Sequence, residues 1–179
     1  MRFGRLRSLL ALVPLLAFPA GASAEPAPLL AHEGEAEELT AETEHMLLAQ
    51  EGLEEEELGK PRDRPRVVSI ALRYLGVPYR WGGASPSGFD CSGFVMYVYN
   101  RVGVSLPHNG AQLWGVGRFV SRDRLAPGDV VFFNGLGHVG IYLGRGRFVH
   151  SPHSGDVVKI SRFSDGWYRS TYVGARRYR

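Results

Sequence analysis

Three residues of this 179-residue chain have the types and the spacing that covalent catalysis requires. Cys91 is the only cysteine, and His138 and His150 follow it, twelve positions apart. A thiol nucleophile needs a base, and the base needs a polar group that orients it. We therefore interpret Cys91 as a nucleophile, His138 as its general base and His150 as the orienting residue. The alternatives are a buried, inert thiol and strand histidines that are satisfied within a core.

The residues around Cys91 predict that it begins a helix. Five apolar residues after it repeat with a helical period, namely Phe94, Val95, Val98, Tyr99 and Val102. Asp90 stands at the N-cap position, which favours Asp. A thiolate at a helix N-terminus gains from the positive end of the macrodipole, so we expect a pKa below the usual value of about 8.5. The charge of Asp90 opposes this unless its carboxylate is turned into the cap.

Residues 138–143 and 147–150 read as two strands joined by a turn at 144–146. Because side chains alternate along a strand, the register decides which residues share a face. If the hairpin is centred on Arg145, His150 faces Gly140 and lies diagonally beside His138, about 7 Å away or less. If the turn is Arg145-Gly146 alone, the register moves by one residue and His153 faces His138 instead.

Helical patterns come first in the chain and strands follow. Helices are expected at 67–75, 91–102 and 109–115, and strands at 130–133, 138–143, 147–150, 157–160 and 172–178. This order predicts an α+β fold in which N-terminal helices pack on an antiparallel sheet of about five strands. The helix that begins at Cys91 would then lie on the sheet that carries His138.

The first 24 residues read as a signal peptide. Arg2, Arg5 and Arg7 precede an apolar run at 9–18, and Ala22-Ser23-Ala24 is a small-residue cleavage site. An uncleaved anchor is the alternative, but the run is much shorter than the roughly 20 residues that span a bilayer. We expect an exported protein of the periplasm, cell envelope or extracellular space, with no stable membrane span after cleavage.

Charge divides the rest of the chain. Residues 25–60 contain twelve Glu and a single Lys, whereas residues 61–179 contain no Glu and carry sixteen Arg and one Lys against six Asp. The acidic part has too few apolar residues for a core of its own. We predict a linker over 25–64, disordered or marginally helical, and one catalytic domain over 65–179.

Several motifs follow one another in a fixed order between about Val67 and Tyr178. They are Tyr79-x-Trp81-Gly82-Gly83, Asp90-Cys91-Ser92-Gly93-Phe94-Val95, Leu106-Pro107, Pro127-Gly128-Asp129-Val130-Val131-Phe132-Phe133, and Gly137-His138-Val139-Gly140-Ile141-Tyr142-Leu143-Gly144 with Val149-His150 after it. Together they resemble the NlpC/P60 family, cysteine peptidases of bacterial cell-wall peptides with a papain-like core. One departure is His108-Asn109 after Leu106-Pro107, where members often have Arg and then Thr or Ser.

The resemblance implies a Cys91–His138–His150 triad and a tyrosine, Tyr79, whose hydroxyl lies beside the thiol and binds the oxyanion. It also implies that Asp90 and Ser92 bind the free amine of the substrate's first residue. The backbone N–H of Cys91 is a further oxyanion donor. Tyr79 as a packing aromatic and Asp90 as a plain N-cap stay open as alternatives.

The activity that the resemblance implies is endopeptidase cleavage of peptidoglycan stem peptides, at the γ-D-glutamyl–diamino acid bond, through a thioester acyl-enzyme. The alternatives are an amidase or acyltransferase of the same fold, or a wall-binding module without activity. The histidines lack metal-ligand spacing and no phosphate-binding glycine loop is present, so we expect no metal and no cofactor. We expect peptidoglycan peptides and anionic wall polymers as partners, and no nucleic acid, which an exported protein rarely meets.

Overall fold

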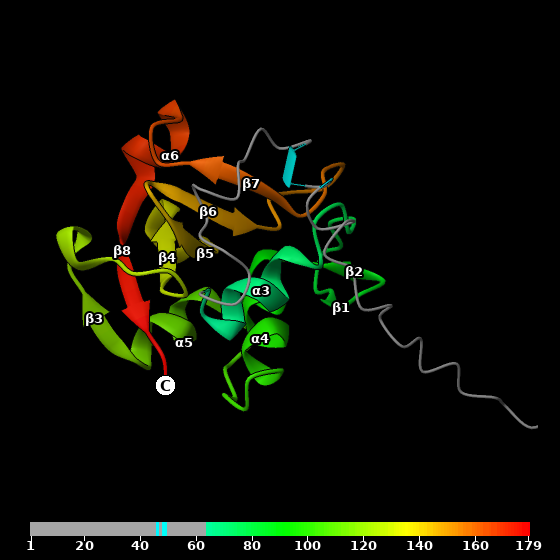
Figure 1. Cartoon of the computed structure of the whole chain (residues 1–179), viewed down its shortest axis with the longest axis horizontal. Coiled ribbons are helices and arrows are strands. Elements are labelled where there is room, and N and C mark those ends of the chain that lie inside the picture. Colours follow the sequence, from blue (N-terminus) through cyan, green and yellow to red (C-terminus); the bar gives the residue numbers. More distant parts are fainter. Residues whose placement is uncertain (1–45, 47, 50–63) are drawn as a thin grey trace, which may run out of the picture. The chain divides into compact units, whose positions relative to one another are not determined.

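The structure is a computed structural model that describes Met46, Leu48, Ala49 and residues 64–179 (Figure 1). The predicted signal peptide (1–24) and nearly all of the predicted linker (25–64) lie outside the described residues. Over the described ranges, no helix combines the length and the apolar character that crossing a membrane requires.

Three helices form where the helical period predicts them: α3 (Arg66–Leu72), α4 (Cys91–Asn100) and α5 (Gly110–Gly115). Helix α4 begins at Cys91, and the Asp90 side chain caps it by accepting from the Gly93 N–H. Asn109 caps α5 in the same way, through the Gln112 N–H at 3.1 Å. Side-chain caps of this kind satisfy backbone donors that the first turn leaves unpaired.

The main sheet has six antiparallel strands in the order β3-β8-β4-β5-β6-β7. They are β3 (Arg118–Val120), β4 (Val130–Phe133), β5 (His138–Gly144), β6 (Arg147–His150), β7 (Lys159–Arg162) and β8 (Tyr172–Arg177). The α+β prediction is confirmed, with six strands rather than about five. Strand β3 was missed because it has three residues and the first two are exposed, and β7 begins two residues later than predicted.

Three short elements also escape the sequence pattern. The glycine-rich loop before Cys91 contains a small hairpin, β1 (Ala84–Ser85) with β2 (Gly88–Phe89). Helix α6 (Gly166–Thr171) precedes β8 and has no buried residue. Elements this short carry too little periodicity to be recognised in advance.

Apolar side chains cover the sheet on both faces. Along β4, Val130 and Phe132 belong to the cluster under the helices, whereas Val131 and Phe133 belong to an aromatic cluster on the opposite face. Alternation along a strand produces this division. Leu48 is 2 % exposed and belongs to the cluster under the helices, so one residue of the segment predicted as a linker takes part in the core.

The β5–β6 hairpin resolves the choice of register. Ile141 pairs with Val149 and Tyr142 with Phe148, as expected for the hairpin centred on Arg145. The register then shifts before Gly144, which pairs with Arg147, so Leu143 is the extra residue of a β-bulge. Arg145 has a φ of 48° in the turn. The turn is thus short, as in the second alternative, but the bulge restores the first register at the two histidines.

Candidate active site

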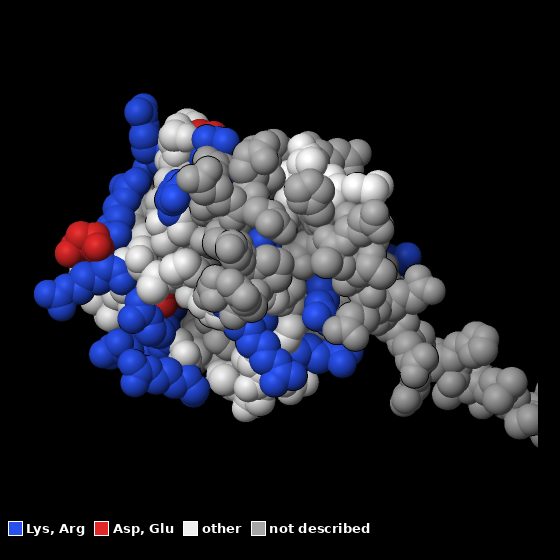
Figure 2. All heavy atoms as spheres, viewed as in Figure 1, with Lys and Arg blue, Asp and Glu red and all other residues white. Residues whose placement is uncertain are grey.

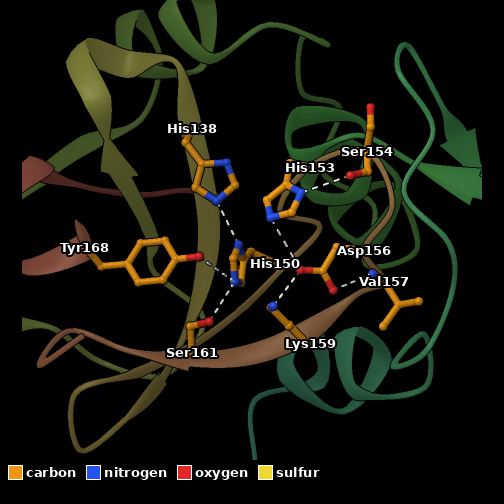
Figure 3. A network of polar contacts seen from close by, with 9 residues as sticks. All are labelled: His138, His150, His153, Ser154, Asp156, Val157, Lys159, Ser161 and Tyr168. Atoms are coloured by element: carbon orange, nitrogen blue, oxygen red, sulfur yellow. Dashed lines mark hydrogen bonds and ion pairs between the residues drawn. The ribbon is translucent and has the colours of Figure 1, made fainter. Parts of the chain in front are cut away.

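His138 and His150 lie on adjacent strands and are joined by a hydrogen bond. His138 is the first residue of β5 and His150 the last of β6, and His138 Nε2 is 2.7 Å from His150 Nδ1 (Figure 3). Gly140 makes this contact possible, since a Cβ there would stand 2.7 Å from Phe148 Cδ2 and 3.1 Å from the Cβ of His150. The prediction that the two histidines share a face is confirmed, and His153 instead points to Ser154 and Asp156.

Two side chains that the sequence analysis missed hold the far side of His150. His150 Nε2 lies 2.9 Å from Ser161 Oγ on β7 and 3.4 Å from the hydroxyl of Tyr168 on α6. Figure 3 shows the resulting chain of contacts from His138 through His150 to these two hydroxyls. No local signal marks Ser161 or Tyr168, because both come from segments whose position depends on the finished sheet.

Burial keeps both histidines neutral. His138 is 6 % exposed and His150 is fully buried. Burial, and then the nearby His153, lower the pKa of His138 to about 4. Burial also lowers the pKa of His150 well below its ordinary value, and the neighbouring His138, Lys159 and His153 act in the same direction. Burial disfavours the charged form of an imidazole, so His138 is a free base at neutral pH.

The neutral state restricts the tautomers. One proton must lie between His138 Nε2 and His150 Nδ1 for these nitrogens to form a hydrogen bond. When His138 is to accept a proton at Nδ1, its own hydrogen is on Nε2 and is donated to His150. His150 then carries its hydrogen on Nε2 and donates it to Ser161 Oγ or Tyr168. Because a hydroxyl can accept as well as donate, the whole chain of contacts accommodates the tautomer in which Nδ1 of His138 is a base.

Cys91 stands at the N-terminus of α4, half-buried and next to the start of β5. Its thiol receives backbone hydrogen bonds from Val139, the residue after His138, and from Ser92 and Cys91 itself. The first turn of α4 also packs closely on the preceding loop. A Cβ on Gly93 would lie 2.0 Å from the Gly83 carbonyl oxygen, so only glycine fits there.

The prediction of a lowered thiol pKa is wrong. Burial of the thiol raises the pKa of Cys91, the negative charge of Asp90 raises it further, and the three backbone hydrogen bonds lower it by less. The Asp90 carboxylate does turn into the cap, with Oδ1 2.7 Å from the Gly93 nitrogen. Its charge nevertheless remains close to the sulfur, so the resting group is a thiol.

Asp90 is the centre of a polar cluster beside the thiol. Ser92 Oγ donates to Asp90 Oδ1 at 3.1 Å, and the Gly82 N–H donates to Oδ2 at 3.0 Å. His108 Nε2 lies 2.9 Å from both carboxylate oxygens. No role for His108 was predicted from the sequence, although His108 is the first residue of the departure after Leu106-Pro107.

Tyr79 lies near this cluster as well. Burial raises the pKa of its hydroxyl, and the proximity of Cys91 and Asp90 raises it further. The structure therefore brings Tyr79, Asp90, Ser92 and Cys91 together around the helix start.

Hydrogen bonds to backbone carbonyls attach the cysteine loop (residues 79–90) to the segment that follows His150. Ser151, which directly follows His150 and is fully buried, donates its hydroxyl to the Phe89 carbonyl at 2.7 Å. The Tyr79 N–H donates to the Asp156 carbonyl at 2.8 Å. These bonds hold residues 79–90 against the end of β6 and thereby position the thiol relative to His138.

Among the residues that the structure describes, no group of three or more His, Cys, Asp or Glu could hold a metal ion. Two hollows of similar size open on the surface. One, of about 450 Å³, borders His138, and the other, of about 460 Å³, lies among arginines at the C-terminal end of the chain. Only the first touches a residue of the Cys91–His138–His150 group.

Known proteins similar in sequence include a gamma-DL-glutamyl hydrolase of Bacillus subtilis, 44% identical over 119 residues. The alignment covers 63% of this chain and 29% of that protein. The murein DD-endopeptidase MepH of Escherichia coli is 40% identical over 115 residues, which are 59% of this chain and 42% of MepH. The chain thus spans less than half the length of each of these two relatives.

Solved structures that resemble this one also contain NlpC/P60 domains. An NlpC/P60 family protein from Bacillus cereus superposes with a TM-score of 0.62 and 34% identity, over 63% of this chain and 39% of that one. RipD from Mycobacterium tuberculosis, described as a non-catalytic NlpC/p60 domain protein adapted to peptidoglycan binding, has a TM-score of 0.55 and 29% identity. That alignment covers 64% of this chain and 95% of RipD.

The sequence profile of the NlpC/P60 family matches residues 76–177, from the loop after α3 to the end of β8. This range is more than half of the chain and contains the cysteine loop, the histidine hairpin and the Asp90 cluster. The protein therefore belongs to the NlpC/P60 family.

Proposed function

We propose that this protein is a cysteine endopeptidase that hydrolyses the peptide stems of peptidoglycan. The observation that carries the proposal is the His138–His150 hydrogen bond beside a helix that begins at Cys91. Relatives named as a gamma-DL-glutamyl hydrolase and a murein DD-endopeptidase support the same substrate class.

Acylation begins with neutral partners. Cys91 Sγ attacks the carbonyl carbon of the scissile amide while Nδ1 of His138 takes the thiol proton. The carbonyl π electrons move to oxygen, and the oxyanion accepts from the Cys91 N–H and the Tyr79 hydroxyl. His150 accepts from Nε2 of His138 and stabilises the imidazolium that forms, as the third member of a triad does.

The C–N bond then breaks. The imidazolium of His138 gives its proton from Nδ1 to the leaving nitrogen, and a thioester remains on Cys91. A water molecule attacks the thioester while His138 takes one of its protons. The carboxylic acid leaves, and the proton on His138 returns to the sulfur to restore the thiol.

The bond cut is the γ-D-glutamyl–diamino acid bond in this proposal. Asp90 and Ser92 are suited to hold a substrate ammonium on the acyl side, because the carboxylate lies in the polar cluster next to the thiol. Cut at this position, the acyl fragment carries a γ-D-glutamyl carbonyl to the sulfur. A D,D-cross-link endopeptidase is the nearest competitor, since MepH bears that name.

Digestion of purified sacculi tests the proposal, with Cys91→Ala as the matched control. A γ-D-glutamyl endopeptidase releases fragments whose new amino terminus is the diamino acid. D,D-cleavage instead opens the cross-link and gives a new carboxyl terminus at D-alanine. An amidase frees whole peptides from the glycan, and an acyltransferase joins the acyl fragment to an added amine. If sacculi bind the wild-type protein without any release, the protein is a wall-binding module of the kind described for RipD.

We also propose export and contact with anionic wall polymers. Figure 2 shows Lys and Arg gathered on the side that carries β3 and β8. Arg118, Arg177 and Arg179 line the hollow of about 460 Å³ there, and Arg124 lies in the adjoining one. Many weak ion pairs act together on such a surface and are screened by salt. Binding to sacculi should weaken as salt rises, and more steeply for sacculi that retain their anionic polymers than for stripped ones.

A further inference from the structure

A hollow of about 450 Å³ opens beside His138 on the side of the aromatic cluster. Three described stretches of the chain line it, with Asn134, Gly137 and His138 from the first, Pro152 and His153 from the second, and Trp167 and Tyr168 from the third. The groups on the other side of the site, Cys91, Asp90 and Tyr79, are not part of its wall. The hollow therefore borders the base and not the nucleophile.

The chemistry of the proposed reaction indicates which part of the substrate would lie in this hollow. The acyl part of the substrate must lie on the thiol, while the leaving nitrogen must come within hydrogen-bond reach of the base that protonates it. Whatever follows that nitrogen continues past His138, away from Cys91. The surface on that side is the hollow.

Trp167 forms the most unusual part of its wall. The side chain lies on the short helix α6 and is 49 % exposed, although its ring centroid is only 6.1 Å from that of His138. Tyr168 packs edge-on against it at 5.1 Å and 87° and supports one side of the indole. A large aromatic face that is held in place and left open beside a reactive group is suited to contact a ligand.

The charges around the hollow indicate what the ligand is. Among the described residues that line it, none is Lys, Arg, Asp or Glu, so these residues offer a bound side chain no ion pair and favour one that is mainly apolar. The carboxylate of Asp156 lies 3.6 Å from Nε2 of the lining residue His153, and the same oxygen also pairs with Lys159 Nζ at 2.5 Å. An indole face also attracts an ammonium group. These features fit a straight aliphatic side chain that ends in an ammonium group.

We propose that this hollow is the subsite for the residue on the amine side of the scissile bond, and that Trp167 selects a diamino acid there. The methylenes of that residue lie along the indole, and its ammonium group lies over the ring or at the Asp156 rim. The inference rests on the proposed peptidase function and adds a specificity-determining residue to it.

Binding of the leaving fragment tests the subsite without any turnover. The probe is L-lysyl-D-alanine, compared with L-alanyl-D-alanine, titrated into Cys91→Ala while the three indole N–H signals are followed by NMR. Trp167→Phe in the same background identifies the Trp167 signal. That signal should shift with the lysyl dipeptide and much less with the alanyl one, while Trp114 on the other face of the sheet stays constant. A shift confined to Trp81, or no shift at tens of millimolar, would overturn the proposal.

Kinetics then separates specificity from general damage. Two substrates share the γ-D-glutamyl acyl part and carry lysine or glycine on the amine side. Trp167→Ala should lower kcat/KM about tenfold for the lysine substrate and less than twofold for the glycine one. Phe119→Ala, which removes another exposed aromatic, should change neither. Equal losses on both substrates would mean that Trp167 acts on His138 itself, which contradicts the subsite.

The two proposals fail in different ways. If the wild-type protein cleaves neither substrate yet the Trp167 signal still shifts with L-lysyl-D-alanine, the subsite stands and the hydrolase proposal falls. If both substrates are cleaved and Trp167→Ala leaves their ratio unchanged, the hydrolase proposal stands and the subsite falls.

Discussion

The two histidines and the thiol of the site lie in different surroundings, which differ in secondary structure, burial and polarity. His138 and His150 lie on adjacent strands, pack against aromatic rings and contact each other through neutral nitrogens. Cys91 and Asp90 lie at a helix end, half-buried, in a cluster of hydroxyl, carboxylate and imidazole groups. Burial lowers the pKa of His138, and burial with Asp90 raises that of Cys91.

This difference has a mechanistic consequence. A preformed thiolate–imidazolium pair requires a thiol pKa below that of its base. Here the pKa of Cys91 is raised and that of His138 is lowered, so the thiol pKa lies above that of the imidazole. The resting site therefore holds a thiol and a neutral imidazole. In the proposed mechanism the proton then moves only as the sulfur attacks, which is general-base catalysis by His138 and not attack by a standing thiolate.

Removing the nucleophile should have the largest effect. Cys91→Ser changes the volume of the side chain little, so the fold should remain, while turnover on sacculi or a γ-D-glutamyl substrate should fall by at least about 10³-fold. Circular dichroism and the Tm check the fold. Wild-type turnover by Cys91→Ser would contradict the assignment of Cys91 as nucleophile.

Removing His150 should lower the turnover rate by a somewhat smaller factor. His150→Ala should lower kcat by about 10²-fold or more, because Nε2 of His138 loses the acceptor that selects its tautomer. His150→Asn should recover part of this loss, since its amide oxygen also accepts. His153→Ala is the matched control and should have little effect, because His153 contacts Ser154 and Asp156 instead. The opposite ranking of His150 and His153 would contradict the observed register.

The buried histidines should also make stability depend on pH. Since the pKa of His138 falls from 6.5 to about 4 on folding, the unfolded chain binds more protons between these values. Stability should therefore rise with pH across this window and be lost as the pH falls from about 6.5 to 4. At about 1.4 kcal/mol for each pKa unit, His138 alone accounts for about 3 kcal/mol.

Urea unfolding at several pH values measures this dependence. His138→Asn should reduce the slope between pH 4 and 6.5 to the part that the buried His150 contributes, while His153→Ala should leave most of it. A wild-type protein whose unfolding free energy does not change over this range would show that His138 is not buried as a neutral base.

The smallest expected effect is a change in the pKa and reactivity of the Cys91 thiol. Asp90→Asn removes the charge that raises the pKa of Cys91 but keeps a good N-cap. The rate of alkylation by iodoacetamide at pH 7 should increase several-fold, and its midpoint with pH should move down. Ser92→Ala, which removes a neutral neighbour, should leave the midpoint nearly unchanged. A midpoint that rises in Asp90→Asn would mean that Asp90 stabilises the thiolate.

Some of this site could be predicted from residue order alone. The helical period after Cys91 and the cap at Asp90 are local patterns, and α4 does begin at Cys91. The parity of His138 and His150 follows from strand alternation, which constrains side chains to one face whatever the rest of the chain does. The alternative register with His153 could not be excluded in advance, because the bulge at Leu143 is set by packing.

The tertiary structure decided which side chains surround these residues. His108, Ser161, Tyr168 and Trp167 reach the site from segments between 17 and 77 positions away from Cys91. It also decided the charge states, because a pKa depends on how far packing removes a group from water. Local sequence predicted a thiol activated by a helix end, and burial beside Asp90 reverses that shift.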